Sequence, residues 1–166
     1  MEVPGPGWPT VLEMGETLPG PPEVVWRLIT DWERQGDWML EARDFVVTTS
    51  FREGVGVEGE ATVSIGGITT RDRVRVTRWE PERRLTIEHE GWVSGVGEMI
   101  LTDVGPGSTH LFWREELHPP MGIIGAVGMS AFRPLMQRIF ERDLKMLASL
   151  TGKTAAATTE RGVYRA

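Results

Sequence analysis

The chain has 166 residues, enough for one domain with a hydrophobic core. Its hydrophobic content of 40% and charged content of 25% are those of an ordinary globular protein, and a net charge of -6 disfavours nucleic-acid binding. Cysteine is absent, which excludes disulfides and thiolate sites and fits a cytoplasmic protein. We also expect no signal peptide and no stable membrane insertion, because no apolar run approaches the roughly 18 residues of a membrane helix.

The first third of the chain predicts one strand and two short helices. Residues 1–10 are rich in proline and glycine and indicate an extended arm. A strand is expected over residues 11–18, and prolines then precede a short helix over residues 23–29. A second short helical segment is expected to reach about Trp38, weakened by Gly36.

From residue 43 the apolar residues alternate with polar ones, which is the period of a half-buried β-strand. The pair Gly66–Gly67 predicts a tight hairpin between two of these strands. The predicted strands cover residues 45–51, 57–65, 69–79, 85–90, 95–104 and 109–117.

A long helix is expected over residues 121–150, with a bend or interruption at Pro134. Its second half is amphipathic, whereas residues 121–132 are apolar nearly all round. Residues 151–166 are small, polar and aperiodic, and we expect a flexible tail there. The domain prediction is therefore an arm (1–10), one folded domain (11–150) and a tail (151–166).

Four stretches resemble the START-like (SRPBCC) superfamily, especially its polyketide cyclase/dehydrase and lipid-transport branch. These stretches are residues 22–32 with Trp38, residues 79–85 around Glu80–Pro81, Gly107–Ser108–Thr109, and residues 140–145 of the last helix. The resemblance implies an α+β helix-grip fold. In that fold a curved seven-stranded antiparallel sheet wraps around a long C-terminal helix, and two short helices follow the first strand.

The resemblance further implies an internal cavity that binds a hydrophobic or aromatic small molecule, as a carrier or to sequester it. The alternative is an enzyme of the cyclase, aromatase or dehydratase type, in which polar cavity residues move protons. A third reading is an interaction protein that uses residues 121–132. The fold alone does not choose among these functions. We expect no cofactor and no metal site, and the chain is expected to be a monomer or a homodimer.

His89 and Glu115 are the candidate catalytic residues. His89 shares a strand face with Leu85 and Ile87, so its imidazole points into an apolar pocket if that face is concave. Either Glu115 or its neighbour Glu116 must point inward, because adjacent residues of a strand face opposite sides. The strands that carry His89 and Glu115 flank a third strand, so the two groups are expected roughly 9–10 Å apart. This separation favours a ligand that bridges them over a direct hydrogen bond, and a salt bridge to an arginine is the structural alternative for Glu115.

The remaining candidates would line the pocket. Trp32 and Trp38 either pack the short helices or form a wall at the cavity mouth. Residues 121–132 are a fully buried helix, a pliable lid or a dimer contact. Which strand face is concave stays open, because a one-residue register shift exchanges the two faces. The predicted ligand-binding residues are Trp32, Trp38, Leu85, Ile87, Met99, Leu111, Trp113, Ile124, Met129 and Phe132.

Overall fold

Seven antiparallel strands form one sheet, in the order β1-β7-β6-β5-β4-β3-β2. The computed structural model describes residues 8–163. The strands are β1 (Thr10–Leu18), β2 (Ala42–Val47), β3 (Glu58–Ile65), β4 (Ile68–Glu80), β5 (Arg84–Glu90), β6 (Ser94–Gly105) and β7 (Ser108–His118). The helices are α1 (Pro22–Ile29), the 3₁₀ helix η1 (Trp32–Asp37) and α2 (Gly122–Val163).

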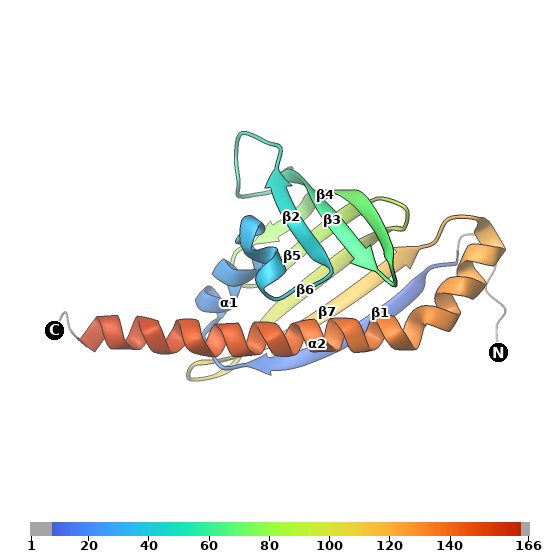
Figure 1. The fold of residues 1–166 in the computed structure, drawn as a ribbon. Helices are drawn as coiled ribbons and strands as arrows, with labels where there is room; N and C mark the ends of the chain where they lie inside the picture. The colour runs from blue at the N-terminus through green and yellow to red at the C-terminus, as the bar shows by residue number, and fades with distance from the viewer. Residues whose placement is uncertain (1–7, 164–166) are drawn as a thin grey trace.

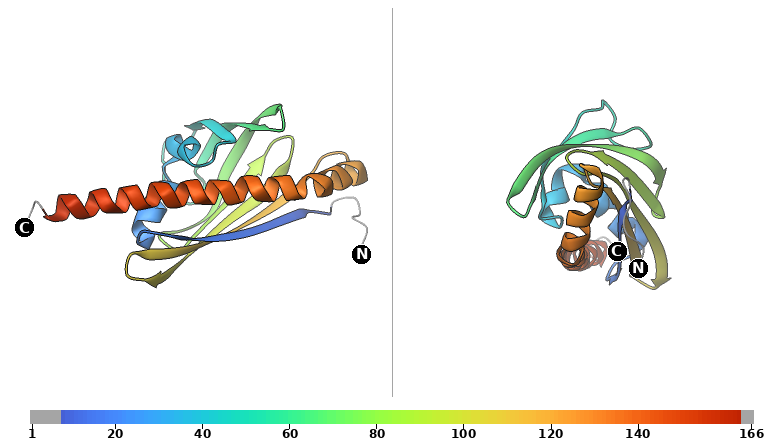
Figure 2. Two further views of the ribbon diagram at one scale, coloured as in Figure 1. Left: turned by 60° about the horizontal axis from the view of Figure 1, so that its bottom comes forward. Right: turned by 90° about the vertical axis from the view of Figure 1, so that its right-hand side faces the viewer.

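The sheet curves around one side of α2, and α1 and η1 lie near one end of the sheet (Figures 1 and 2). α2 runs along β1, where Arg133 and Gln137 donate hydrogen bonds to the β1 backbone carbonyls of Val11 and Glu13. The predicted helix-grip architecture is therefore confirmed. Within residues 8–163, no helix combines the length and the apolar character that crossing a membrane requires.

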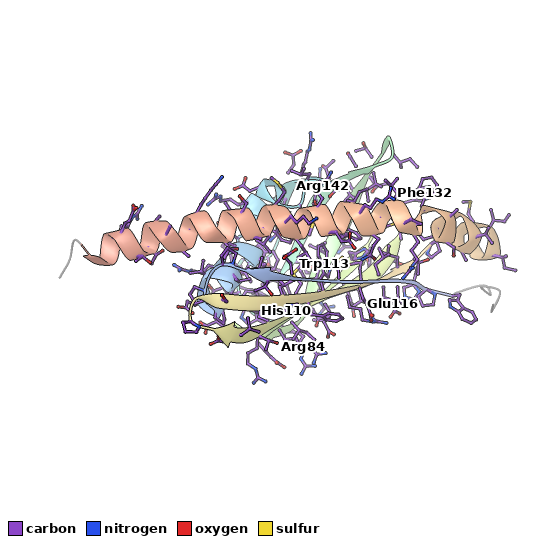
Figure 3. The ribbon with its side chains drawn as sticks, turned by 90° about the horizontal axis from the view of Figure 1, so that it is seen from below. Arg84, His110, Trp113, Glu116, Phe132 and Arg142 are labelled. Atoms are coloured by element: carbon purple, nitrogen blue, oxygen red, sulfur yellow. The ribbon has the colours of Figure 1, made fainter. Side chains whose placement is uncertain are left out.

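The alternation of buried residues identifies the concave face of the sheet. In β7, Leu111, Trp113, Glu115 and Leu117 are buried, and the intervening residues are half-buried. The antiparallel pairing places the odd-numbered residues of β5 and β6 on the same face. Figure 3 agrees, because Trp113 lies between the sheet and α2, whereas Arg84, His110 and Glu116 lie on the far side of the sheet. Glu115 is thus the inward carboxylate.

β2 begins and ends earlier than predicted. The strand covers Ala42–Val47 instead of residues 45–51. Thr49 explains the early end, because its hydroxyl donates to the carbonyl of Phe51 and accepts from the amide of Glu58. These bonds take the place of the strand ladder.

Of the predicted N-terminal arm, residues 1–7 lie outside the described residues, and Thr10 already belongs to β1.

α2 extends beyond its predicted C-terminal end, whereas its start agrees with the prediction. The helix continues through Pro134 and bends in its first third (Figure 1), as predicted for a helix-interior proline. It also continues from residue 151 to Val163, where an irregular tail was predicted. Alanines favour a helix in this stretch, and tertiary packing supports it: the side chain of Thr151 is fully buried against Gly20. The polar composition of this stretch gives no indication of the contact with Gly20.

The contact between Gly20 and Thr151 makes a prediction about stability. A methyl group added at Gly20 would lie 2.6 Å from Cγ2 of Thr151, so Gly20→Ala should destabilise the fold. We expect a loss of about 1–3 kcal/mol in the free energy of unfolding, the usual cost of overpacking, measured by urea denaturation.

Two variants make this test specific. Gly128→Ala adds a methyl group to an open position of α2, so it should be neutral or stabilise by up to about 1 kcal/mol. Thr151→Ser removes Cγ2 and should restore part of the stability that Gly20→Ala loses. A Gly20→Ala protein as stable as the wild type would show that residues 151–163 do not pack as described.

Candidate functional site

All the predicted site residues of β5, β6 and β7 except Leu111, which pairs with Leu101, lie in three cross-strand rows on the concave face. Each row takes one residue from each strand, because the three strands pair in antiparallel register. The rows are Leu85, Met99 and Trp113; Ile87, Gly97 and Glu115; and His89, Gly95 and Leu117.

His89 and Glu115 make a direct hydrogen bond. His89 Nε2 donates to Glu115 Oε1 at 2.7 Å, so the expected gap between the two groups is wrong. The reason is that the intervening strand carries glycine at both positions. A Cβ at Gly95 would lie 2.7 Å from His89 Nε2, and one at Gly97 would lie 2.7 Å from Glu115 Oε2. The two side chains therefore lie flat across β6 and meet in the space that its missing side chains leave.

Trp113 fixes the second oxygen of Glu115. Its indole Nε1 donates to Glu115 Oε2 at 2.9 Å, and Trp113 is itself 3% exposed. The Trp113 ring packs against Trp38, with 6.0 Å between ring centroids, and against Phe140 of α2, with 4.9 Å. Because both of its oxygens accept hydrogen bonds from neighbouring side chains, the Glu115 carboxylate has a defined orientation.

Asp72 of β4 is a third polar residue on the same face as His89 and Glu115. It was not among the residues predicted from the sequence. Its carboxylate is buried, and its Oδ1 accepts a hydrogen bond from Thr70 at 2.8 Å. A third glycine makes room for it, because a Cβ at Gly91 would overlap the Asp72 carboxylate. The sequence contained an indication that Asp72 is buried, because it shares a strand face with Val74 and Val76. We call Asp72, His89 and Glu115 the concave polar cluster.

The environment favours the charged form of His89. Burial lowers the pKa of His89, but the hydrogen bond and charge of Glu115 outweigh this effect, helped by the charge of Asp72 and the backbone of Val93. The pKa is therefore raised above its ordinary value of 6.5. Within residues 8–163, no three acidic or histidine side chains converge as metal ligands would.

The family model for polyketide cyclase/dehydrase and lipid transport matches residues 10–152 of the chain. The chain belongs to this family. No curated protein is significantly similar to it. Membership in the polyketide cyclase/dehydrase and lipid-transport family implies a cavity for a hydrophobic ligand between the sheet and the long helix.

Solved structures share the fold at low sequence identity. A protein from Thermus thermophilus is 22% identical with a TM-score of 0.72, covering 88% of this chain and 99% of its own. A START superfamily protein from Mycobacterium smegmatis is 13% identical with a TM-score of 0.65, covering 89% and 98%. An aromatase/cyclase from a Streptomyces species is 16% identical with a TM-score of 0.66, covering 89% and 94%. At these identities the likeness describes the fold and no activity.

Within the family fold, the predicted pocket residues separate into two groups. Leu85, Met99, Leu111 and Trp113 are buried on the concave face near the cluster. Trp32 and Trp38 are also buried, which favours the packing account over a wall at the cavity mouth. Trp32 stacks on Phe45 and donates its Nε1 to the carbonyl of Arg52 at 2.8 Å.

The first part of α2 is more exposed than a buried helix would be. Ile124 is 77% exposed and Phe132 is 56% exposed, so the structure does not bring these two predicted pocket residues into contact with the cluster. Met129 is half-buried and packs against the core. The fully buried account of residues 121–132 is therefore wrong, and the lid and dimer-contact accounts stay predictions.

A second polar group, also missed from the sequence, joins α2 to the segment before β2. Asp143 lies on the buried face of α2, and Arg142 pairs with its carboxylate and with that of Glu41. Burial and the neighbouring Glu41, opposed by Arg142, raise the pKa of Asp143 from 3.8 to about 7.

A cleft of about 230 Å³ lies between β1 and α2. It is lined by Met14, Gly15, Glu16, Glu141, Leu144 and Lys145. None of these residues belongs to the concave polar cluster. The cleft is a seam between β1 and α2.

The His89–Glu115 hydrogen bond predicts a measurable titration. NMR titration of the His89 ring should give a pKa above 6.5, and Glu115→Gln should lower that pKa because the burial remains and the charge is lost. The pKa of His89 is higher in the folded protein than in the unfolded chain. The pair with Glu115 therefore stabilises the fold below pH 6.5, and this contribution is lost as the pH rises through the folded-state pKa of His89. Glu116→Gln, on the opposite face of β7, should leave the His89 titration unchanged. A wild-type pKa at or below 6.5 would contradict the ion pair.

Asp143 predicts a separate pH dependence. Its raised pKa means that its contribution to stability is present below pH 3.8 and is lost as the pH rises through about 7. Asp143→Asn removes this titration, so its free energy of unfolding should vary less than that of the wild type between about pH 4 and about pH 8. Urea denaturation across this range is the measurement, and Glu141→Gln on the exposed side of α2 is the control. Parallel curves for the wild type and Asp143→Asn would rule out the raised pKa of Asp143.

Proposed function

We propose that this protein binds a hydrophobic or aromatic small molecule on the concave face of the sheet, with the polar end of the molecule at the concave polar cluster. The observation that carries the proposal is the position of this cluster on an otherwise apolar face. Asp72, His89 and Glu115 are surrounded by aliphatic and aromatic side chains, and they occupy space that three glycines vacate. Small-molecule sites commonly combine such an apolar wall with a few placed polar groups.

The burial pattern of the concave face supports this location. Val63, Ile65, Val74 and Ile87 point to the concave side yet stay half-buried. The concave residues at the level of Trp113 are buried by α2 and the aromatic side chains around it. The part of the face near His89 is thus less covered by the protein's own core, and a ligand would complete its burial. Each Å² of apolar surface so buried stabilises the complex by about 25 cal/mol before entropic costs.

The family supports the same assignment at a coarser level, since its description includes lipid transport. A carrier requires no acid or base, only apolar surface and a means of orienting the ligand. The exposed apolar side chains of α2, such as Ile124 and Phe132, are consistent with a pliable lid beside the ligand. Gly122, Gly125 and Gly128 in the same segment would make it easier to deform.

The second candidate function is catalysis of the cyclase, aromatase or dehydratase type. The 2.7 Å hydrogen bond between His89 and Glu115 favours it, because a carboxylate that orients an imidazole is a common acid–base arrangement. One structural relative is an aromatase/cyclase, which makes a polyketide-like substrate a reasonable choice. In this function His89 would donate and accept the proton, and Glu115 would hold its charged form. Turnover would then depend on His89, whereas simple binding would not.

Binding of a neutral fluorescent probe tests the proposed site. N-phenyl-1-naphthylamine should bind saturably at one molecule per chain, with increased fluorescence. Ile87→Trp fills the concave face beside Gly97 and should weaken binding by about tenfold or more, whereas Glu88→Trp on the opposite face should not. Circular dichroism melting of both variants serves as the folding control. Absence of saturable binding, or equal binding by both variants, would rule out the proposed site.

A further inference from the structure

The hydrogen bonds of the concave polar cluster all end on its carboxylates. His89 Nε2 donates to Glu115 Oε1. Trp113 Nε1 donates to Glu115 Oε2, and the hydroxyl of Thr70 donates to Asp72 Oδ1. These three donors are therefore used within the protein.

The carboxylates of Glu115 and Asp72 can accept further hydrogen bonds. An ionised carboxylate can accept about four hydrogen bonds. Glu115 uses one site on each oxygen, for His89 and Trp113, and Asp72 accepts one bond from Thr70. Two carboxylates also outnumber the single imidazole, so the cluster carries a net negative charge even when His89 is protonated. A ligand group that approaches it meets unused acceptors and an anionic field.

We propose that the ligand presents a hydroxyl group, a phenol or an alcohol, to one carboxylate of the cluster, Asp72 or Glu115, and that the site rejects ligands with a carboxylate end. This inference rests on the proposed function and specifies its ligand class. A hydroxyl donates one hydrogen bond and carries no charge. A carboxylate offers no donor and would add a third negative group.

Three probes of similar size separate these possibilities. 2-Naphthol carries a hydroxyl donor, 2-methoxynaphthalene an ether acceptor, and 2-naphthoate an anionic carboxylate. Each is titrated at neutral pH to displace N-phenyl-1-naphthylamine from the full-length protein. We expect 2-naphthol to bind at least about tenfold more tightly than 2-naphthoate, with 2-methoxynaphthalene between them.

Matched variants assign the preference to the cluster. Glu115→Gln should reduce the naphthol-to-naphthoate affinity ratio by at least about threefold, because it removes the charge. Glu116→Gln makes the same change on the opposite face of β7 and should leave the ratio unchanged. Asp72→Asn provides a second variant if Glu115→Gln fails to fold, with the same expected loss of preference.

The outcomes distinguish the two levels of the proposal. A naphthoate affinity equal to or above that of naphthol would overturn the inference while leaving the binding site in place. An equal ratio in Glu115→Gln, Asp72→Asn and Glu116→Gln would likewise overturn it. If N-phenyl-1-naphthylamine itself does not bind, the proposed function fails and the inference fails with it.

Discussion

Three glycines on the concave side of the sheet determine where the polar groups of this protein can lie. Gly91, Gly95 and Gly97 each leave a space that a neighbouring strand's polar side chain occupies: Asp72, His89 and Glu115, respectively. Side chains normally stand away from the sheet and stay on their own strands. Here the missing side chains let two groups from β5 and β7 meet across β6. Any larger residue at Gly95 or Gly97 would displace the His89–Glu115 hydrogen bond, so the cluster depends on these positions.

The same arrangement lowers the stability of the sheet, which indicates that these residues serve a purpose other than stability. Glycine weakens a strand interior because it loses more conformational entropy on folding and packs no side chain. Burying a charged pair adds a desolvation cost that the pair's own attraction often fails to offset. A sheet selected for stability alone would place an aliphatic residue at Gly97 and at Glu115. Both costs fall on one patch of the concave face, as expected where a fold gives up local stability for a site.

Much of the fold follows from periodicity, whereas the site depends on register. The period-two pattern after residue 43 predicts the strands, and the Gly66–Gly67 hairpin follows from turn chemistry alone. The sequence could not decide between Glu115 and Glu116, because one residue of shift exchanges the faces. It also placed His89 and Glu115 too far apart, because the effect of Gly95 and Gly97 appears only when the three strands are aligned. Asp143 and the helix beyond residue 150 were missed for a similar reason, since their partners, Glu41 and Gly20, are distant in sequence.

α2 combines two environments, and its segments before and after Pro134 have different relations to the proposed ligand site. The segment after Pro134 is held by the core, for example through Phe140 against Trp113. The segment before Pro134 keeps apolar side chains such as Ile124 exposed. A movement of the first segment would therefore break fewer buried contacts, whereas a movement of the second would disturb the ring that orients Glu115. An opening before Pro134 would leave Trp113 and the concave polar cluster in place, as the proposed binding of an apolar molecule with one polar group requires.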